Sequence, residues 1–229
     1  MNQETNSDNF AINLGMLDKN LWLEKVQKAY SEACSDSMDG FKLLYCKWKL
    51  IYSSELAFIS LNPGRAPDRQ GNCLISDEDG NSYLREKDIT KSAMTKQFLK
   101  ICEGLKIPAE SVLTGVVIPF RTNRERDLNH KTREIGNVIG GEFWSVVLDQ
   151  QQLRNIIVVG NSTMKVISSI KGLIPIVKYN TGWGKTRIRV YEDSNKKRYF
   201  HLPHLSSYQL FSNQKYSSIF FEAFSQHSL

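Results

Sequence analysis

The sequence has no run of about 18 consecutive apolar residues, which is the length that a membrane-spanning helix needs. Its first ten residues, MNQETNSDNF, are polar and lack the basic-then-apolar order of a signal peptide. These two absences predict a protein without a membrane partner, located in the cytoplasm.

Cysteine is also scarce, and its spacing excludes the common metal sites. The chain has four cysteines, Cys34, Cys46, Cys73 and Cys102, with no C-x-x-C pair and no histidine at zinc-finger spacing. We therefore expect reduced thiols that are mostly buried, and neither an iron–sulfur cluster nor a structural zinc. No metal and no cofactor is expected.

The composition is that of a globular protein with a basic balance. Of the 229 residues 41% are hydrophobic and 24% are charged, which is enough to bury a core and argues against disorder. Lysine and arginine total 30 against 24 aspartates and glutamates, a net charge of +6. This balance is compatible with a polyanionic partner, but a solvated basic surface without a ligand explains it equally well.

Short apolar runs alternate with segments of helical periodicity. Strands are expected at 56–61, 112–119, 155–160, 187–192 and 198–202, and helices at 21–33, 93–105, 134–152, 161–170 and 213–226, with Asn161 as a helix cap. Residues 42–53 are read as either strand or helix, and the polar stretch 64–92 is too long for a simple connection. The pattern predicts one α/β domain over residues 1–229, with a loose N-terminal lead-in over 1–19 and a mainly parallel sheet covered on both faces.

Ligands of such a sheet bind outside the carboxyl ends of its strands, so the segments after the strands are the candidates for a site. Three of them are rich in polar groups: Leu61–Arg65, Pro119–Arg124 and Pro203–Tyr208. If the strands are parallel neighbours, these segments meet at one rim.

Two of the segments resemble the active-site motifs of a known superfamily. Ser60-Leu61-Asn62-Pro63-Gly64 resembles the first motif of the uracil-DNA glycosylase superfamily, in the form used by its mismatch-specific and single-strand-selective members. His204-Leu205-Ser206 resembles the second motif, His-Pro-Ser. The resemblance spans roughly residues 55–212. It implies a three-layer α/β/α sandwich with a central mainly parallel sheet, and a DNA glycosylase that removes uracil or a related damaged base in DNA repair.

The resemblance also assigns roles. Asn62 would orient a water and His204 would donate to the departing base, because negative charge develops on its oxygen. Ser206 and the backbone near Gly64 would hold phosphates, with Gly64 also beside the base. Base flipping calls for an apolar wedge, for which Tyr208 or Leu210 is the candidate, although Leu210 and Phe211 can equally seat the loop on the core.

One departure from the superfamily concerns recognition of the base. Several branches carry a Thr-Asn pair after the second strand, and its asparagine reads the uracil edge. The corresponding pair here is Thr114-Gly115. If that alignment holds, the base-reading amide is missing, and Asn123 is the candidate replacement.

The residues around the rim add further candidates. Phe120 follows the second strand and can stack on a flipped base or pack in the core. Segment 121–133 has five basic and two acidic residues and a net charge of +3. Segment 185–198 has six basic and two acidic residues and a net charge of +4. Arg65, Arg121 and Arg124 are the candidate DNA contacts, because phosphates bind such clusters, but solvated loops look similar.

Three other patterns are set aside. Gly182-Trp183-Gly184-Lys185-Thr186 ends like a phosphate-binding P-loop but lacks the glycine five places earlier and leads into a strand. His201 and His204 lack a third metal ligand, and Trp183 and Trp144 are expected to pack in the core or on the surface. Two rival functions stay open: a non-catalytic nucleic-acid-binding protein with a glycosylase-like pocket, and a nucleoside or nucleotide hydrolase.

Overall fold

The computed structural model describes residues 17–33, 38–64, 73–88 and 92–229. Within these ranges, no helix has the length and apolar character to cross a membrane. Most of the expected lead-in, residues 1–16, lies outside them. The end of that segment is not loose, because Leu17 is buried in the core and a helix already begins at Lys19.

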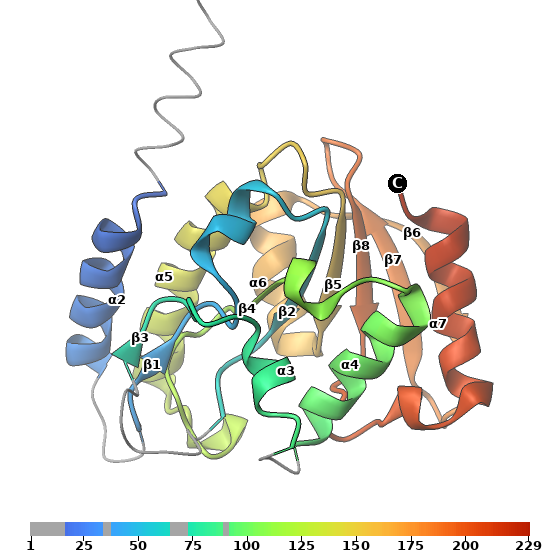
Figure 1. Cartoon of the computed structure of the whole chain (residues 1–229), viewed down its shortest axis with the longest axis horizontal. Coiled ribbons are helices and arrows are strands. Elements are labelled where there is room, and N and C mark those ends of the chain that lie inside the picture. The colour runs from blue at the N-terminus through green and yellow to red at the C-terminus, as the bar shows by residue number, and fades with distance from the viewer. Residues whose placement is uncertain (1–16, 34–37, 65–72, 89–91) are drawn as a thin grey trace, which may run out of the picture.

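A six-stranded sheet runs through the centre of the described structure (Figure 1), in the order β4-β2-β5-β8-β7-β6. The strands are β2 (Leu56–Ser60), β4 (Leu113–Val116), β5 (Asn155–Val159), β6 (Ile174–Asn180), β7 (Arg187–Glu192) and β8 (Arg198–Leu202). β4, β2, β5 and β8 run parallel, whereas β7 and β6 are antiparallel to their neighbours. The expected mixed α/β fold with a mainly parallel sheet is confirmed.

Helices cover both faces of this sheet (Figure 1). The helices are α2 (Lys19–Ala33), α3 (Ser82–Arg85), α4 (Ala93–Leu105), α5 (His130–Val147), α6 (Asn161–Lys171) and α7 (Gln214–His227). One hydrophobic cluster joins α2, α5 and α6 to the sheet, and a second joins α3, α4 and α7 to its other face. The arrangement is compatible with a three-layer α/β/α sandwich.

Strand β2 shows how the sequence produces two cores. All five of its residues are buried. Because successive side chains of a strand point to opposite faces, Ala57 and Ile59 pack towards α2 and α5 while Phe58 packs towards α3 and α4. This is why a parallel strand covered on both faces reads as a continuous apolar run.

Strand β6 and one helix cap were not foreseen. β6 contains Pro175, which argues against a central strand, and it lies at the sheet edge, where Ile174 is 65% and Ile176 is 43% exposed. Its pairing with β7 shifts register between Pro175 and Val177. The prediction that Asn161 caps α6 is wrong, since the capping position belongs to Gly160, whose φ is 90°.

The two segments that the sequence left undecided form short elements. Residues 42–53 contribute to strand β1 (Phe41–Lys42) and to a 3₁₀ helix (Trp48–Tyr52). The polar stretch 64–92 contains β3 (Cys73–Leu74), which pairs with β1, and α3. Asn81 caps α3, because its side chain accepts a hydrogen bond from the backbone of Tyr83.

Three of the four cysteines lie in the described ranges, and all three are free thiols. Cys46 and Cys102 are buried, and burial raises the pKa of each thiol to about 12, so both stay protonated at neutral pH. Cys73 is exposed, and Cys34 lies outside the described residues. The buried thiols therefore act as small apolar side chains.

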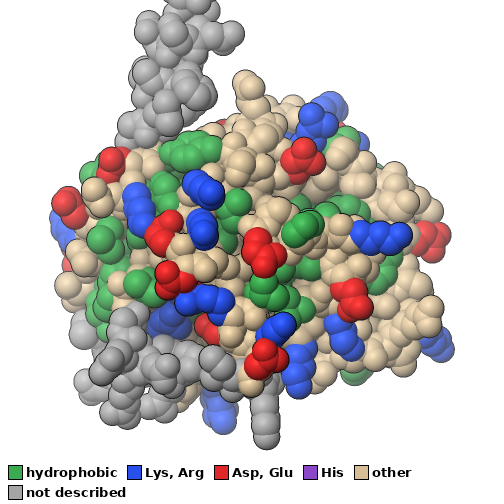
Figure 2. All heavy atoms as spheres, viewed as in Figure 1, with side chains coloured by type: hydrophobic (Ala, Val, Ile, Leu, Met, Phe, Trp, Pro, Cys, Tyr) green, Lys and Arg blue, Asp and Glu red, His purple; other side chains and the backbone are tan. Residues whose placement is uncertain are grey.

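Charge is distributed unevenly over the surface. On the face seen in Figure 2, which includes α3 and α4, basic and acidic side chains are interspersed with hydrophobic ones. Around the pocket described next, basic side chains outnumber acidic ones.

Candidate functional site

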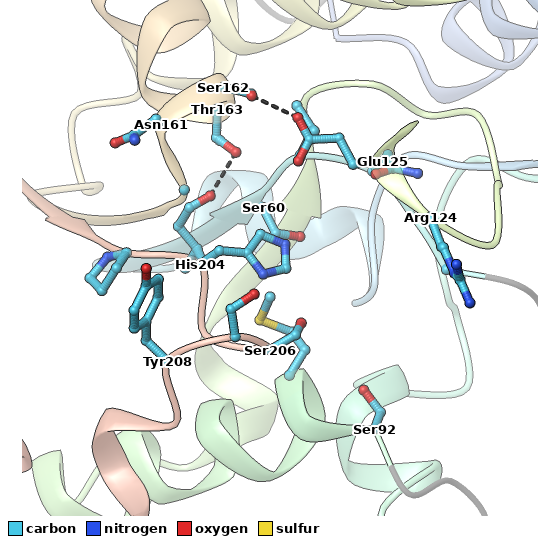
Figure 3. Close-up of a pocket in the computed structure, with 18 of the residues that line it drawn as sticks. Ser60, Ser92, Arg124, Glu125, Asn161, Ser162, Thr163, His204, Ser206 and Tyr208 are labelled. Carbon is cyan, nitrogen blue, oxygen red and sulfur yellow. Dashed lines mark hydrogen bonds between the residues drawn. The ribbon is translucent and has the colours of Figure 1, made fainter. Parts of the chain in front are cut away.

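A pocket with a volume of about 1420 Å³ opens at the carboxyl ends of the parallel strands. Residues that directly follow β2, β5 and β8 line it, as does the loop from Arg121 that comes after β4, and both Asn62 and His204 are among the lining residues. Figure 3 shows the His204 ring between the amino end of α6 and the loop that carries Ser206 and Tyr208, with Arg124 on the opposite side. The structure thus brings the two motif residues to one cavity.

The side chain of Asn62 is held in one orientation. Its Nδ2 donates to the Thr122 hydroxyl at 2.9 Å and to the Pro63 carbonyl at 3.1 Å. The Thr122 hydroxyl itself donates to the Arg124 carbonyl at 3.0 Å, so it can only accept from Asn62. This network requires the nitrogen on that side and leaves Oδ1 as the free acceptor, with no donor among the described residues. The role of Thr122 was not visible in the sequence.

His204 starts a tight turn at the end of β8. Its carbonyl accepts from the backbone amides of Ser207 at 3.0 Å and Tyr208 at 2.9 Å. Its ring lies beside Gly160, at a position where a side chain on that glycine would come within 3.6 Å of the imidazole. The buried Nδ1 has no hydrogen-bond partner among the described residues, so the imidazole is not committed to a structural contact.

The loop after His204 is anchored by buried groups. Leu205 and Leu210 are fully buried, and Phe211 is nearly so. The buried Gln97 on α4 accepts from the Phe211 backbone amide at 2.7 Å and donates to Ser212 Oγ at 2.9 Å. Leu210 therefore seats the loop on the core, and its proposed role as a wedge is wrong. Gln97 is a second residue that sequence reasoning missed.

Two predicted DNA contacts of this loop do reach the pocket. Ser206 is exposed and lines it, and Tyr208, which is 37% exposed, also lines it. Tyr208 is thus the one wedge candidate of the pair that an external ligand can touch.

Phe120 does not reach the pocket. Its ring is fully buried and lies 6.0 Å from that of Tyr30, so the prediction that it stacks on a base is wrong. Tyr45 and Tyr83 line the pocket instead, stacked on each other with ring centroids 4.9 Å apart. Burial raises the pKa of both phenols, which stay neutral and able to donate. The cap formed by Asn81 is the sequence signal that could have revealed the short helix carrying Tyr83.

The other predicted site residues divide into buried and exposed groups. Arg121 is only 6% exposed, and its guanidinium donates to the Gly64 carbonyl at 3.0 Å. It therefore braces the first motif loop; Arg121 also lines the pocket, and its contact with a DNA backbone stays a prediction. Gly64, Asn123 and Arg124 are exposed and line the pocket, and Arg65 lies outside the described residues.

The pocket is strongly cationic. Seven arginine and lysine side chains line it against two glutamates, Glu86 and Glu125. Glu125 is engaged, since it pairs with Arg133 at 3.3 Å and accepts from Ser162 at 2.8 Å, as Figure 3 shows for the serine. A chain of net charge +6 thus concentrates basic groups at one opening, which favours an anionic ligand.

A second histidine lies deeper in the wall. His201 is 3% exposed, and its Nδ1 is 3.5 Å from Arg189 Nη1. Burial, with the Arg189 charge adding to it, lowers the pKa of His201 to about 4, so this imidazole is neutral at pH 7. His201 and Arg189 both line the pocket, and within the described residues no three metal-ligating side chains gather.

Gly115 faces away from the pocket. A Cβ on this residue would lie 2.8 Å from the Leu43 carbonyl and 2.9 Å from the Trp144 ring, both inside the core beneath α5. An asparagine at this position would point into that core, not towards Asn62. Gly115 is therefore a packing glycine, and its lack of an amide says nothing about which base enters the pocket.

Comparison of the sequence with models of known families found no match, and a comparison with curated proteins found none either. The assignment of a function to this pocket therefore depends on its own geometry and on the two motifs.

Proposed function

We propose that the protein is a DNA glycosylase, which hydrolyses the N-glycosidic bond of uracil or a related damaged base. The observation that supports this best is the position of Asn62. Its Oδ1 is the free acceptor of a fixed amide, and it shares one pocket with His204.

The proposed reaction breaks the bond between C1′ of the sugar and the ring nitrogen of the base. The electron pair of that bond leaves with the base, while positive charge develops on the sugar. Water, held by a hydrogen bond to Asn62 Oδ1, adds its oxygen to C1′ and releases a proton to solvent or to the free base. The products are an abasic sugar and the base.

His204 supplies the other half of the charge balance. An N–H of its imidazole donates to the base oxygen on which negative charge grows, and such a donor is most effective where it has no competing partner. Its Nδ1 is buried, so the nitrogen proposed to face the base is Nε2, for which no described residue is a hydrogen-bond partner. Asn62 cannot take a proton at neutral pH, so in this proposal it positions the water and does not act as a base.

The walls of the pocket suit a base extruded from a strand. The buried Tyr45 and Tyr83 add aromatic side chains to these walls, although their rings pack on each other and on Lys42 and Phe98. Exposed basic groups such as Arg124 and Lys185 surround the opening, where phosphates of the strand would pass. Binding to DNA should therefore weaken steeply with salt.

The test uses end-labelled oligonucleotides that contain one uracil, as single strands and as duplexes, treated with alkali after incubation. Wild-type protein should leave abasic sites that alkali cleaves, and Asn62→Ala and His204→Ala should lower the rate by at least about 100-fold, the loss typical of a transition-state donor. Asn195→Ala, in the turn between β7 and β8, and His130→Ala, with a nearly fully exposed side chain, are the matched controls and should cleave normally.

The same assay separates the rival functions. Salt-sensitive DNA binding without release of any base from uracil, hypoxanthine or mismatched substrates would overturn the proposal in favour of a non-catalytic binding protein. Release of base from free nucleosides or nucleotides but not from DNA would overturn it in favour of a nucleoside hydrolase.

A further inference from the structure

The turn between β6 and β7 carries an aromatic side chain to the rim of the pocket. Trp183 lines the pocket and is half-buried. Its ring lies edge-on to that of Tyr208, with centroids 6.2 Å apart, and packs on Tyr216 at 5.2 Å. Packing is thus only part of what Trp183 does, because both it and Tyr208 also line the pocket.

The turn is built to hold Trp183 in place. The Trp183 backbone amide donates to Thr181 Oγ1 at 3.1 Å, and its carbonyl accepts from Thr186 Oγ1 at 2.7 Å. The two threonine hydroxyls also bond to each other. Gly182 and Gly184 have φ of 76° and 56°, a conformation that glycine adopts without strain. A ring presented this way loses little freedom when it binds a ligand.

The charge of this segment is of one sign. Residues 180–191 contain Lys185, Arg187 and Arg189 and no acidic residue, and all three line the pocket. An aromatic surface beside a row of basic groups is the arrangement by which proteins bind single-stranded nucleic acid, with bases stacked on rings and phosphates on cations.

We propose that the Trp183 ring is a stacking surface for the nucleobase next to the one in the pocket, with Tyr208 edge-on beside it and with Lys185 and Arg187 holding the phosphate between the two nucleotides. The inference rests on the proposed function in that it takes the ligand to be DNA. It goes further by naming the substrate as a single or locally unpaired strand, because a base stacked on Trp183 cannot also be stacked within a duplex.

Tryptophan fluorescence gives the first test. The other three tryptophans, Trp22, Trp48 and Trp144, are buried, so quenching by a stacked base reports on Trp183. The probe is a five-nucleotide single strand with a central 2′-fluoro-2′-deoxyuridine, whose fluorine slows loss of the base. We expect saturable quenching in the wild type and none in Trp183→Phe. The proposal is overturned if quenching persists in Trp183→Phe. It is also overturned if the wild type shows no quenching while fluorescence anisotropy shows that the strand is bound.

The second test removes either partner of the stack. An abasic spacer on the 5′ or the 3′ side of the fluorinated nucleotide deletes the neighbouring base, and Trp183→Leu deletes the ring. One spacer position and the substitution should each weaken binding by about 5- to 150-fold, the value of one stacked base. Together they should weaken it no more than either alone, because they remove the same contact.

Two further variants serve as controls for the effect of Trp183→Leu on binding. Trp183→Phe keeps a ring that packs on Tyr216 and should retain most of the affinity, which separates stacking from loss of the fold. Tyr52 lies outside the pocket and has nearly the same exposure as Tyr208, so the Tyr52→Leu protein should bind like the wild type. Effects of spacer and Trp183→Leu that simply multiply, or a Trp183→Leu protein that binds normally, would contradict the inference.

The outcomes also separate this inference from the glycosylase proposal. Base release from uracil DNA without any coupling between Trp183 and the neighbouring base would refute the stacking surface alone. Coupling and quenching without base release would leave the stacking surface standing and refute the catalytic proposal.

Discussion

Substitution of Gly115 by asparagine would add a side chain to the face of β4 that packs beneath α5. A Cβ there lies 2.8 Å from the Leu43 carbonyl and 2.9 Å from Trp144, closer than such contacts allow. Overpacking a core of this kind costs about 1–3 kcal/mol. A buried amide without partners adds about 1–3 kcal/mol, so the free energy of unfolding should fall by about 2–6 kcal/mol. For a chain of this size the melting temperature should drop by about 5–20 °C.

Urea unfolding and the uracil assay together test this reasoning. The matched control is Gly141→Ala on α5, where the nearest atom to the new Cβ is 3.7 Å away, and a helical alanine should raise stability by about 0.5–1 kcal/mol. Gly115→Asn should show no gain in base release at temperatures where it stays folded. A Gly115→Asn protein as stable as the wild type, with base release raised tenfold, would show that Gly115 faces the base after all.

Three further predictions follow from contacts of buried side chains. Thr122→Val removes a hydrogen bond of about 1 kcal/mol that fixes the orientation of the Asn62 amide, so the rate of base release should fall about fivefold or more. Thr122→Ser should keep the wild-type rate, and kinetics at saturating DNA measure both. Burial lowers the pKa of His201 to about 4, so the folded state resists protonation of this imidazole. The free energy of unfolding should therefore fall by up to about 3 kcal/mol as the pH drops from about 6.5 to 4. Urea titrations at pH 7 and 4.5, compared with those of His201→Gln, isolate the contribution of His201. Lys42→Met removes the 2.9 Å ion pair of the buried Asp77 carboxylate, which keeps its contacts with Arg85 and Ser82, so the free energy of unfolding should fall by about 1.5–3 kcal/mol. Lys42→Met combined with Asp77→Leu should recover most of that loss in the same unfolding assay.

The sequence predicted those parts of the fold in which the pattern is local. α4, β7 and β8 have the expected bounds, and β2 and β5 differ from them by one residue, because continuous apolar runs and helical spacing report burial directly. β6 was missed because Pro175 interrupts its pattern. An edge strand tolerates a proline whose missing N–H would face no partner, and no local signal tells an edge from the centre of a sheet.

The sequence predicted the site residues that belong to the two motifs at strand ends. It did not predict which loop side chains are buried in the core and which line the pocket. Asn62 and His204 line one pocket, as expected from residues that follow parallel strands. Tyr208 and Leu210 are two places apart in one loop, yet only the first is accessible, because the second is fully buried. The same holds for Phe120, whose burial depends on α2, a helix some 90 residues earlier in the chain.

The free edge of β6 bears on how the protein behaves in concentrated solution. An outer strand with Ile174 and Ile176 exposed offers a template on which a second molecule can add its own strand. Pro175 between them has no N–H to give, and the shifted register beside it breaks the even ladder that such an addition needs. The proline is thus a safeguard against aggregation, and Pro175→Val should turn a monodisperse sample into one that forms intermolecular sheet.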